Sequence, residues 1–219
     1  MPDLQFNIEG SEAVAHAAVP MLALKLRITN HSASEAIHSI TLRCQVQIEP
    51  TRRRYTPPEQ EMLRDLFGEP ERWSRTVRSM LWMNTSIAVP AFTGNTLVDL
   101  ELPCSFDFNV ATTKYFHALE SGDIPLCVLY SGTVFYPGDN GALQVAHIPW
   151  DRENNYGFPA ATWRQMIDAY YPNSAWLRLE RDTFDRLYQY KVRHGIMTWE
   201  KLLDKLVPSE EAEENRLPV

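Results

Sequence analysis

The sequence predicts a mainly β protein, a β-sandwich of immunoglobulin-like style, with a helical insertion and a C-terminal α-helical cap, so that it is α+β overall. Residues 40–49 alternate apolar and polar side chains without interruption, as a strand with one buried face does. Residues 22–29 alternate in the same way, and the polar stretch 30–35 predicts that the two strands pair antiparallel. Helical spacing of apolar residues after Trp150 predicts the cap.

Further strands follow from the same alternation, or from apolar runs between turn residues. Leu4, Phe6 and Ile8 alternate with polar residues in a first short strand. Residues 124–135 are almost continuously apolar, which is typical of a central strand covered on both faces, and the turn residues 137–141 predict a hairpin after it. The remaining predicted strands are residues 37–49, 81–89, 96–102, 105–110 and 143–148, whereas residues 111–119 fit either a short helix or a bulged strand.

Helix starts have their own local signals. Thr56, Pro57 and Glu59 form the pattern of a helix N-terminus with a capping box, which predicts a helical insertion over residues 56–78. Pro159, Asp182 and Thr198 begin the predicted C-terminal helices. We therefore expect a sandwich domain at 1–150 with the insertion at 56–78, a helical region at 151–207 packed on it, and a disordered acidic tail at 208–219.

Composition excludes some classes of function. With 44% apolar residues, the 219-residue chain can build a sizeable core, and its net charge of −7 argues against a general nucleic-acid binder. We expect no leader peptide before the first strand, and no apolar run is long enough to span a membrane. Three widely spaced cysteines favour reduced thiols and a cytoplasmic location, and their spacing predicts neither a metal site nor a cofactor.

Two groups of residues are candidates for binding. Lys114, Tyr115 and His117 place a cation, a phenol and an imidazole side by side, as a ligand-binding or acid–base site would; a histidine hydrogen-bonded at a sheet edge explains the same pattern. Arginines in and before the insertion suit an acidic protein partner, although interleaved carboxylates also fit an ordinary salt-bridged surface. The candidate partner-binding residues are Arg52, Arg53, Arg54, Arg75 and Trp73.

Aromatic residues are frequent in the C-terminal region. We expect most of them to pack the helices onto the sandwich and one or two to remain exposed as anchors of an interface. The residues concerned are Trp150, Trp163, Tyr170, Tyr171, Trp176 and Tyr188.

Several segments together resemble a known family. They are residues 42–50 and 52–55, residues 66–73, residues 114–119, residues 131–135, residues 149–151 and residues 175–179. Over roughly residues 4–206 the chain resembles an uncharacterised bacterial protein family of unknown function, whose members are often encoded near nickel–iron (NiFe) hydrogenase genes. The resemblance implies an accessory role in hydrogenase assembly or maturation, with a hydrogenase subunit or maturation factor as the partner.

The sequence thus favours a non-enzymatic interaction or accessory protein. The alternative is a small-ligand binding module or an enzyme, with a pocket between the sandwich and the helical cap. A third possibility is metal handling through Cys104 with a nearby histidine.

Overall fold

The structure, a computed structural model, describes residues 2–32, 36–104, 110–138, 140–173 and 179–207. It is a mixed α+β protein with two antiparallel sheets, and its contacts divide the chain into two compact units, Met1–Ser174 and Ala175–Val219. In the described parts of the chain, no helix has the length and apolar composition that crossing a bilayer requires.

The smaller sheet has three strands in the order β1-β2-β5, with β2 in the centre. Its strands are β1 (Leu4–Ala13), β2 (Met21–Asn30) and β5 (Asn95–Pro103). Leu22, Leu24 and Leu26 of the central strand are fully buried, which confirms the face that the alternation predicted.

The larger sheet is built around the long strand β6, which pairs with β3 on one edge and with both β7 and β8 on the other. Its strands are β3 (Ser39–Ile48), β4 (Met80–Val89), β6 (Asp123–Pro137), β7 (Leu143–His147) and β8 (Glu153–Pro159). β6 and its hairpin with β7 confirm the predicted central strand and turn. β8 is a strand where the sequence predicted none.

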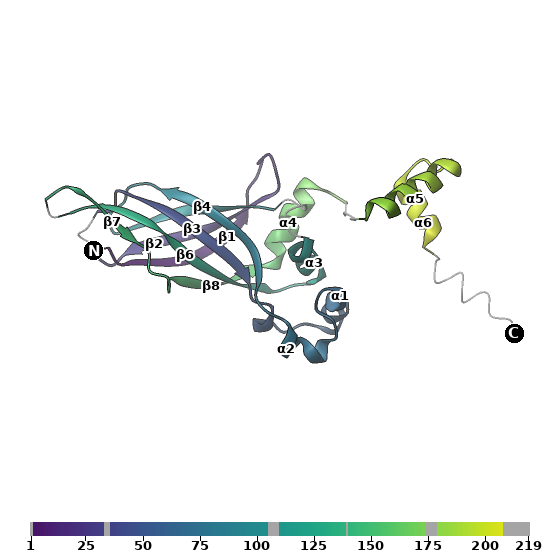
Figure 1. Cartoon of the computed structure of the whole chain (residues 1–219), viewed down its shortest axis with the longest axis horizontal. Helices are drawn as coiled ribbons and strands as arrows, with labels where there is room; N and C mark the ends of the chain where they lie inside the picture. The colour runs from purple at the N-terminus through teal and green to yellow at the C-terminus, as the bar shows by residue number, and fades with distance from the viewer. Residues whose placement is uncertain (1, 33–35, 105–109, 139, 174–178, 208–219) are drawn as a thin grey trace. The chain divides into compact units, whose positions relative to one another are not determined.

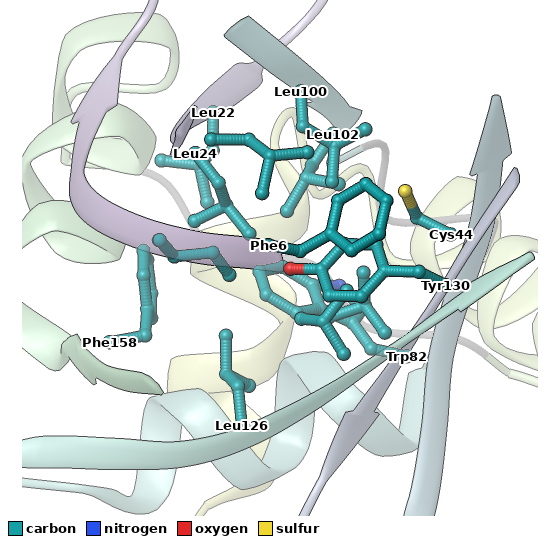
Figure 2. Close-up of a cluster of buried hydrophobic side chains, with 14 of the residues drawn as sticks. Phe6, Leu22, Leu24, Cys44, Trp82, Leu100, Leu102, Leu126, Tyr130 and Phe158 are labelled. Atoms are coloured by element: carbon teal, nitrogen blue, oxygen red, sulfur yellow. The ribbon is translucent and has the colours of Figure 1, made fainter. Parts of the chain in front are cut away.

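Figure 1 shows the strands of both sheets, and Figure 2 shows side chains from both sheets in one shared core. Leu22, Leu24, Leu100 and Leu102 come from the smaller sheet, and Cys44, Trp82, Leu126, Tyr130 and Phe158 come from the larger one. The ring of Phe6 on β1 stacks on that of Tyr130 on β6, with the ring centroids 4.5 Å apart. The β-sandwich arrangement and its immunoglobulin-like style stay predictions.

The predicted pairing of β2 with β3 is wrong, because the two strands lie in different sheets. β2 pairs with β1 and β5, and β3 pairs with β4 and β6. Alternation identifies the buried face of each strand but not its hydrogen-bonded neighbour. The buried residues of both strands contribute to the same core.

Helices of the first unit follow the predicted signals closely. The capping box at the start of α1 is formed, with the Thr56 hydroxyl accepting from the Glu59 N–H and the Glu59 carboxylate accepting from the Thr56 N–H. The ambiguous segment is helical, and the strand predicted over 105–110 falls largely outside the described residues. The bounds are η1 (Pro50–Arg52), α1 (Pro57–Phe67), η2 (Pro70–Arg72), α2 (Trp73–Thr76), α3 (Val110–Ala118) and α4 (Ala160–Tyr170).

The first unit extends beyond residue 150, where the sequence placed the end of the sandwich domain. β8 pairs with β6, and α4 adds Ala160, Trp163 and Met166 to the core. The second unit contains α5 (Arg181–Arg193) and α6 (Trp199–Leu206), both close to their predicted positions. Leu202 is the one buried side chain on these two helices. The acidic tail lies outside the described residues.

Candidate functional site

The candidate site is built on residues 50–78, which we call the arginine-rich segment. Its centre is Glu59, whose carboxylate is only 1% exposed. This carboxylate accepts hydrogen bonds from the Thr56 N–H at 2.9 Å and the Glu120 N–H at 3.0 Å, and from Nη2 of Arg53 at 2.6 Å. Glu59 therefore joins the start of α1 to the end of the α3 region.

Arg53 completes this arrangement and is a structural residue. Besides Glu59, its guanidinium donates to the carbonyl oxygens of Ser121 and Asp123, at 2.5 and 2.8 Å. Burial alone would raise the pKa of Glu59, but the two backbone N–H donors and the Arg53 guanidinium outweigh burial, so that the pKa lies below its ordinary value. The carboxylate is therefore charged at neutral pH and neutralises Arg53.

The other carboxylates of the arginine-rich segment are also mostly paired. Glu61 and Glu69 both contact Arg64, with N–O distances of 3.2 Å, and Asp65 contacts Lys114. The exposed Arg78 donates to the Val77 carbonyl at 3.1 Å. In the same segment, Arg54, Arg72 and Arg75 are exposed, and their guanidinium groups contact no carboxylate or other acceptor among the described residues. We call these three the free arginines. Arg52 is exposed as well and donates to the side-chain oxygen of Asn155.

A cavity of about 210 Å³ lies within the arginine-rich segment. Tyr55, Phe67 and Trp73 form its aromatic walls, with Trp73 nearly perpendicular to the other two rings at centroid distances of 5.4 and 5.5 Å. The indole N–H of Trp73 donates to the carbonyl of Gly68, at 2.9 Å, just after α1 ends. Arg53 and Ser74 also line the cavity.

The structure does not bring Lys114, Tyr115 and His117 together as a ligand site. Tyr115 is fully buried, and its hydroxyl lies 2.8 Å from that of Tyr55, which donates to the Pro50 carbonyl. Burial raises the pKa of Tyr115 to about 12. Lys114 and His117 are exposed on the other side of α3, and Lys114 is in its ion pair with Asp65.

The predicted aromatic residues divide between core and surface. Trp163 is buried, and the hydroxyl of Tyr170 donates to the Ala17 carbonyl at 2.9 Å, so both hold α4 in place. Trp150 is 91% exposed and Tyr188 is 52% exposed. Tyr171 is half-buried, and Trp176 lies outside the described residues.

The cysteines are neutral thiols at physiological pH. Burial raises the pKa of Cys44 and of Cys104 to about 12, and Cys127 is also buried. Cys104 is half-buried and its Sγ lies 3.2 Å from the Leu102 carbonyl. In the part of the chain that the structure describes, no three His, Cys, Asp or Glu residues gather as metal ligands would.

Sequence reasoning missed two features of this site. The capping box predicts Glu59 at a helix start, but nothing local indicates its contact with Arg53 or with the distant Glu120. Tyr55 and Phe67 were not candidates, although their rings build the cavity with Trp73. An aromatic residue directly before a helix cap, as Tyr55 is, was the one signal available.

Comparisons with known proteins place the chain in a family. No curated protein matches it significantly. A crystal structure described as a putative ApaA protein from Bordetella pertussis is 14% identical, covers 72% of this chain and 95% of that chain, and has a TM-score of 0.25. That likeness is too weak to carry an argument. The family of unknown function DUF6084 matches residues 1–215, and the chain belongs to it.

Proposed function

We propose that this protein is a non-enzymatic interaction or accessory protein, which binds an acidic protein partner through the arginine-rich segment. The observation that supports the proposal is the pairing of charges. Carboxylates of the segment contact Arg53, Arg64 and Lys114, which leaves the free arginines exposed without a carboxylate among the described residues. The segment contributes local positive charge to a chain whose net charge is −7.

Free guanidinium groups suit this role physically. Each offers up to five N–H donors in a planar fork, which matches a carboxylate in a bidentate arrangement. Surface charge of this kind speeds association and selects partners of opposite charge, and salt weakens it. Trp73 and Tyr55 lie beside these arginines in the sequence, and tryptophan, tyrosine and arginine are enriched in the residues that dominate binding energy.

The partner to test first follows from the family resemblance, which implies assembly or maturation of a nickel–iron hydrogenase. We propose a hydrogenase subunit or maturation factor in the cytoplasm as that partner, and an immunoglobulin-like sandwich as the scaffold. Tagged protein purified from its host under gentle cross-linking is expected to carry this partner. Repeated recovery of the protein alone would contradict the proposal.

A charge-matched pair of variants tests the surface. Arg54, Arg72 and Arg75 changed together to alanine should reduce partner capture strongly, while the melting temperature stays nearly the same because exposed charges contribute only about 0–1 kcal/mol each. The control changes Arg181, Arg193 and Lys201 to alanine, which removes the same charge from exposed positions on α5 and α6. Equal capture by both triple variants would show that the arginine-rich segment is not the interface.

The alternative, a small-ligand module or enzyme, stays a prediction. The geometry does not support the ligand site predicted at Lys114, Tyr115 and His117, since the Tyr115 side chain is buried and the other two are exposed on α3.

A further inference from the structure

We propose that the cavity walled by Tyr55, Phe67 and Trp73 is an anchor site, which accepts one apolar side chain from an acidic segment of the partner protein. This inference rests on the proposed function and names the chemistry of the partner: a peptide segment with carboxylates around a single leucine-sized or aromatic residue.

The size of the cavity fits one side chain better than a larger ligand. Its volume of about 210 Å³ is smaller than the roughly 300–1,000 Å³ that sites for cofactors and drug-sized molecules occupy. Pro50 and Val77 add apolar surface to the three aromatic walls, so that a nonpolar group would leave water on entering. In a typical interface, a few residues that fill well-packed, desolvated pockets contribute most of the affinity.

The walls are held in place before any partner binds. The Tyr55 hydroxyl donates to the Pro50 carbonyl at 2.7 Å and lies 2.8 Å from the Tyr115 hydroxyl. Trp73 is held by its hydrogen bond to Gly68 and by its edge-to-face contact with Phe67. A preformed pocket of this kind binds with little loss of conformational entropy.

Arg53 is the charged residue of the cavity wall. Arg53 lines the cavity with a side chain that is only 10% exposed, and its buried Nε–H has no hydrogen-bond acceptor among the described residues. A buried donor without an acceptor is destabilising. The rest of the guanidinium is fixed by Glu59 and by the carbonyls of Ser121 and Asp123, so that Arg53 is a rigid part of the cavity wall.

The charges around the cavity select an acidic segment. Arg54 lies between Arg53 and Tyr55 in the chain, and Arg72 and Arg75 flank Trp73 and Ser74, so each free arginine is a direct neighbour of a residue in the wall. A nucleic acid would also supply negative charge, but its phosphates extend along its whole length and would meet the rest of a chain whose net charge is −7, whereas a short acidic segment meets only the arginines. The partner is therefore a protein segment.

Two labelled peptides of equal charge test the anchor. One has leucine at the centre of a short run of glutamates, and the other has serine at that position. In fluorescence anisotropy with the full chain, the Kd of the leucine peptide should be at least about tenfold lower than the Kd of the serine peptide. Burying a leucine side chain contributes at least the free energy of a tenfold change in Kd. A leucine peptide without glutamates should bind weakly, and its affinity should not depend on salt concentration.

Blocking the cavity provides the second arm. Ser74→Trp, which fills it from α2, should abolish the preference for leucine, while both peptides keep the weak, salt-sensitive binding that the arginines supply. Ala18→Trp is the control, because it adds the same ring at an exposed position between β1 and β2. Thr51→Trp fills the cavity from η1 and replaces Ser74→Trp if that variant fails to fold by circular dichroism.

The outcomes separate the inference from the proposed function. Equal binding of both peptides, unchanged by Ser74→Trp, would overturn the anchor site and leave the acidic-partner surface standing. If neither peptide binds, the anchor site is overturned too. The partner-capture experiment then tests whether the arginine-rich segment binds an acidic partner. Tighter binding of a single-stranded oligonucleotide than of either peptide would contradict a protein partner.

Discussion

At the scale of single residues, the Arg53–Glu59 pair shows why an arginine cannot be assigned a role from its neighbours in the sequence. Arg52, Arg53 and Arg54 are consecutive, yet only Arg53 is buried against a carboxylate. Removing one member of a buried ion pair leaves the other charged without compensation, and this is costly even where the intact pair contributes little. Arg53 is therefore unsuitable as a probe of partner binding.

Glu59→Gln should reduce the free energy of unfolding by about 3 kcal/mol at neutral pH, because it leaves the Arg53 guanidinium buried without a counter-charge. The pKa of Glu59 is lowered by folding from its ordinary value of 4.5. Its stabilisation is therefore complete above pH 4.5 and is lost as the pH falls through the lower folded value. The difference between the parent protein and the variant should shrink in acid, as measured by urea denaturation at several pH values.

Glu61→Gln is the control for this measurement. Glu61 is on the same helix but is exposed, and it contacts Arg64 on the surface. We expect its effect to stay within about 0.5 kcal/mol at every pH. An equal loss in both variants would mean that Glu59 has no special role.

Leu42→Asp should prevent soluble folding. Leu42 is 0% exposed at the centre of β3, and a carboxylate there has no partner. Thr41→Asp places the same charge on the exposed side of that strand and should give soluble protein with a cooperative melting transition. Soluble, cooperatively melting Leu42→Asp protein would show that the inner face of β3 is misassigned.

At the scale of elements, β6 changes its partner strand at Gly132. Residues before it pair with β8 and residues after it pair with β7, while β3 pairs on the other edge from Leu126 to Phe135, across this change. Gly132 has φ of +148° and lies directly against the backbone of Thr41. The close approach leaves no room for a side chain, so this position requires glycine.

Gly132→Ala is expected to destabilise the protein by more than about 2 kcal/mol, because its Cβ would lie 2.1 Å from the Thr41 carbonyl oxygen. Gly141→Ala provides the comparison, since its φ of +76° is strained for alanine but no atom lies within 4 Å of the added Cβ. That variant should lose only about 1 kcal/mol. Similar losses in chemical denaturation would mean that the β3–β6 contact can adjust.

At the scale of the whole molecule, the first compact unit ends after α4 and not at residue 150. Phe158, Trp163 and Met166 lie beyond residue 150 and are all in the core. Loss of a large buried side chain costs about 2–5 kcal/mol, so that losing three costs about as much as the roughly 5–15 kcal/mol by which a domain is stable. A chain that stops at residue 150 therefore lacks an essential part of the core.

Two truncated chains test this division. Residues 1–174 expressed alone should be soluble and melt cooperatively, with a near-ultraviolet circular dichroism spectrum that reports packed aromatic rings. Residues 1–150 should be insoluble or melt without a cooperative transition. A folded 1–150 chain would show that β8 and α4 are appended to a core that is complete without them.

Much of the fold can be predicted locally. The buried faces of β2, β3 and β6 follow from alternation or apolar runs, and the start of α1 follows from Thr56 and Glu59. β8 was missed because Glu153, Asn154 and Asn155 have low strand propensity, and pairing with β6 alone makes them a strand. In the candidate site, Arg52, Arg53, Arg54, Arg75 and Trp73 were candidates from the sequence, but Arg72 was not, and local patterns could not divide the arginines into buried and free.

The sequence by itself determined which side of β1, β2 and β3 is buried and where most helices begin, since these depend on side chains only a few residues apart. The tertiary structure decided that β2 and β3 belong to different sheets, that Arg53 is structural, and that Arg54, Arg72 and Arg75 contact no carboxylate among the described residues. Those outcomes depend on contacts such as that between Glu59 and Glu120, which lie 61 residues apart. The local spacing of residues contains no information about which distant groups come into contact. Strand pairing and ion pairs depend on such long-range contacts.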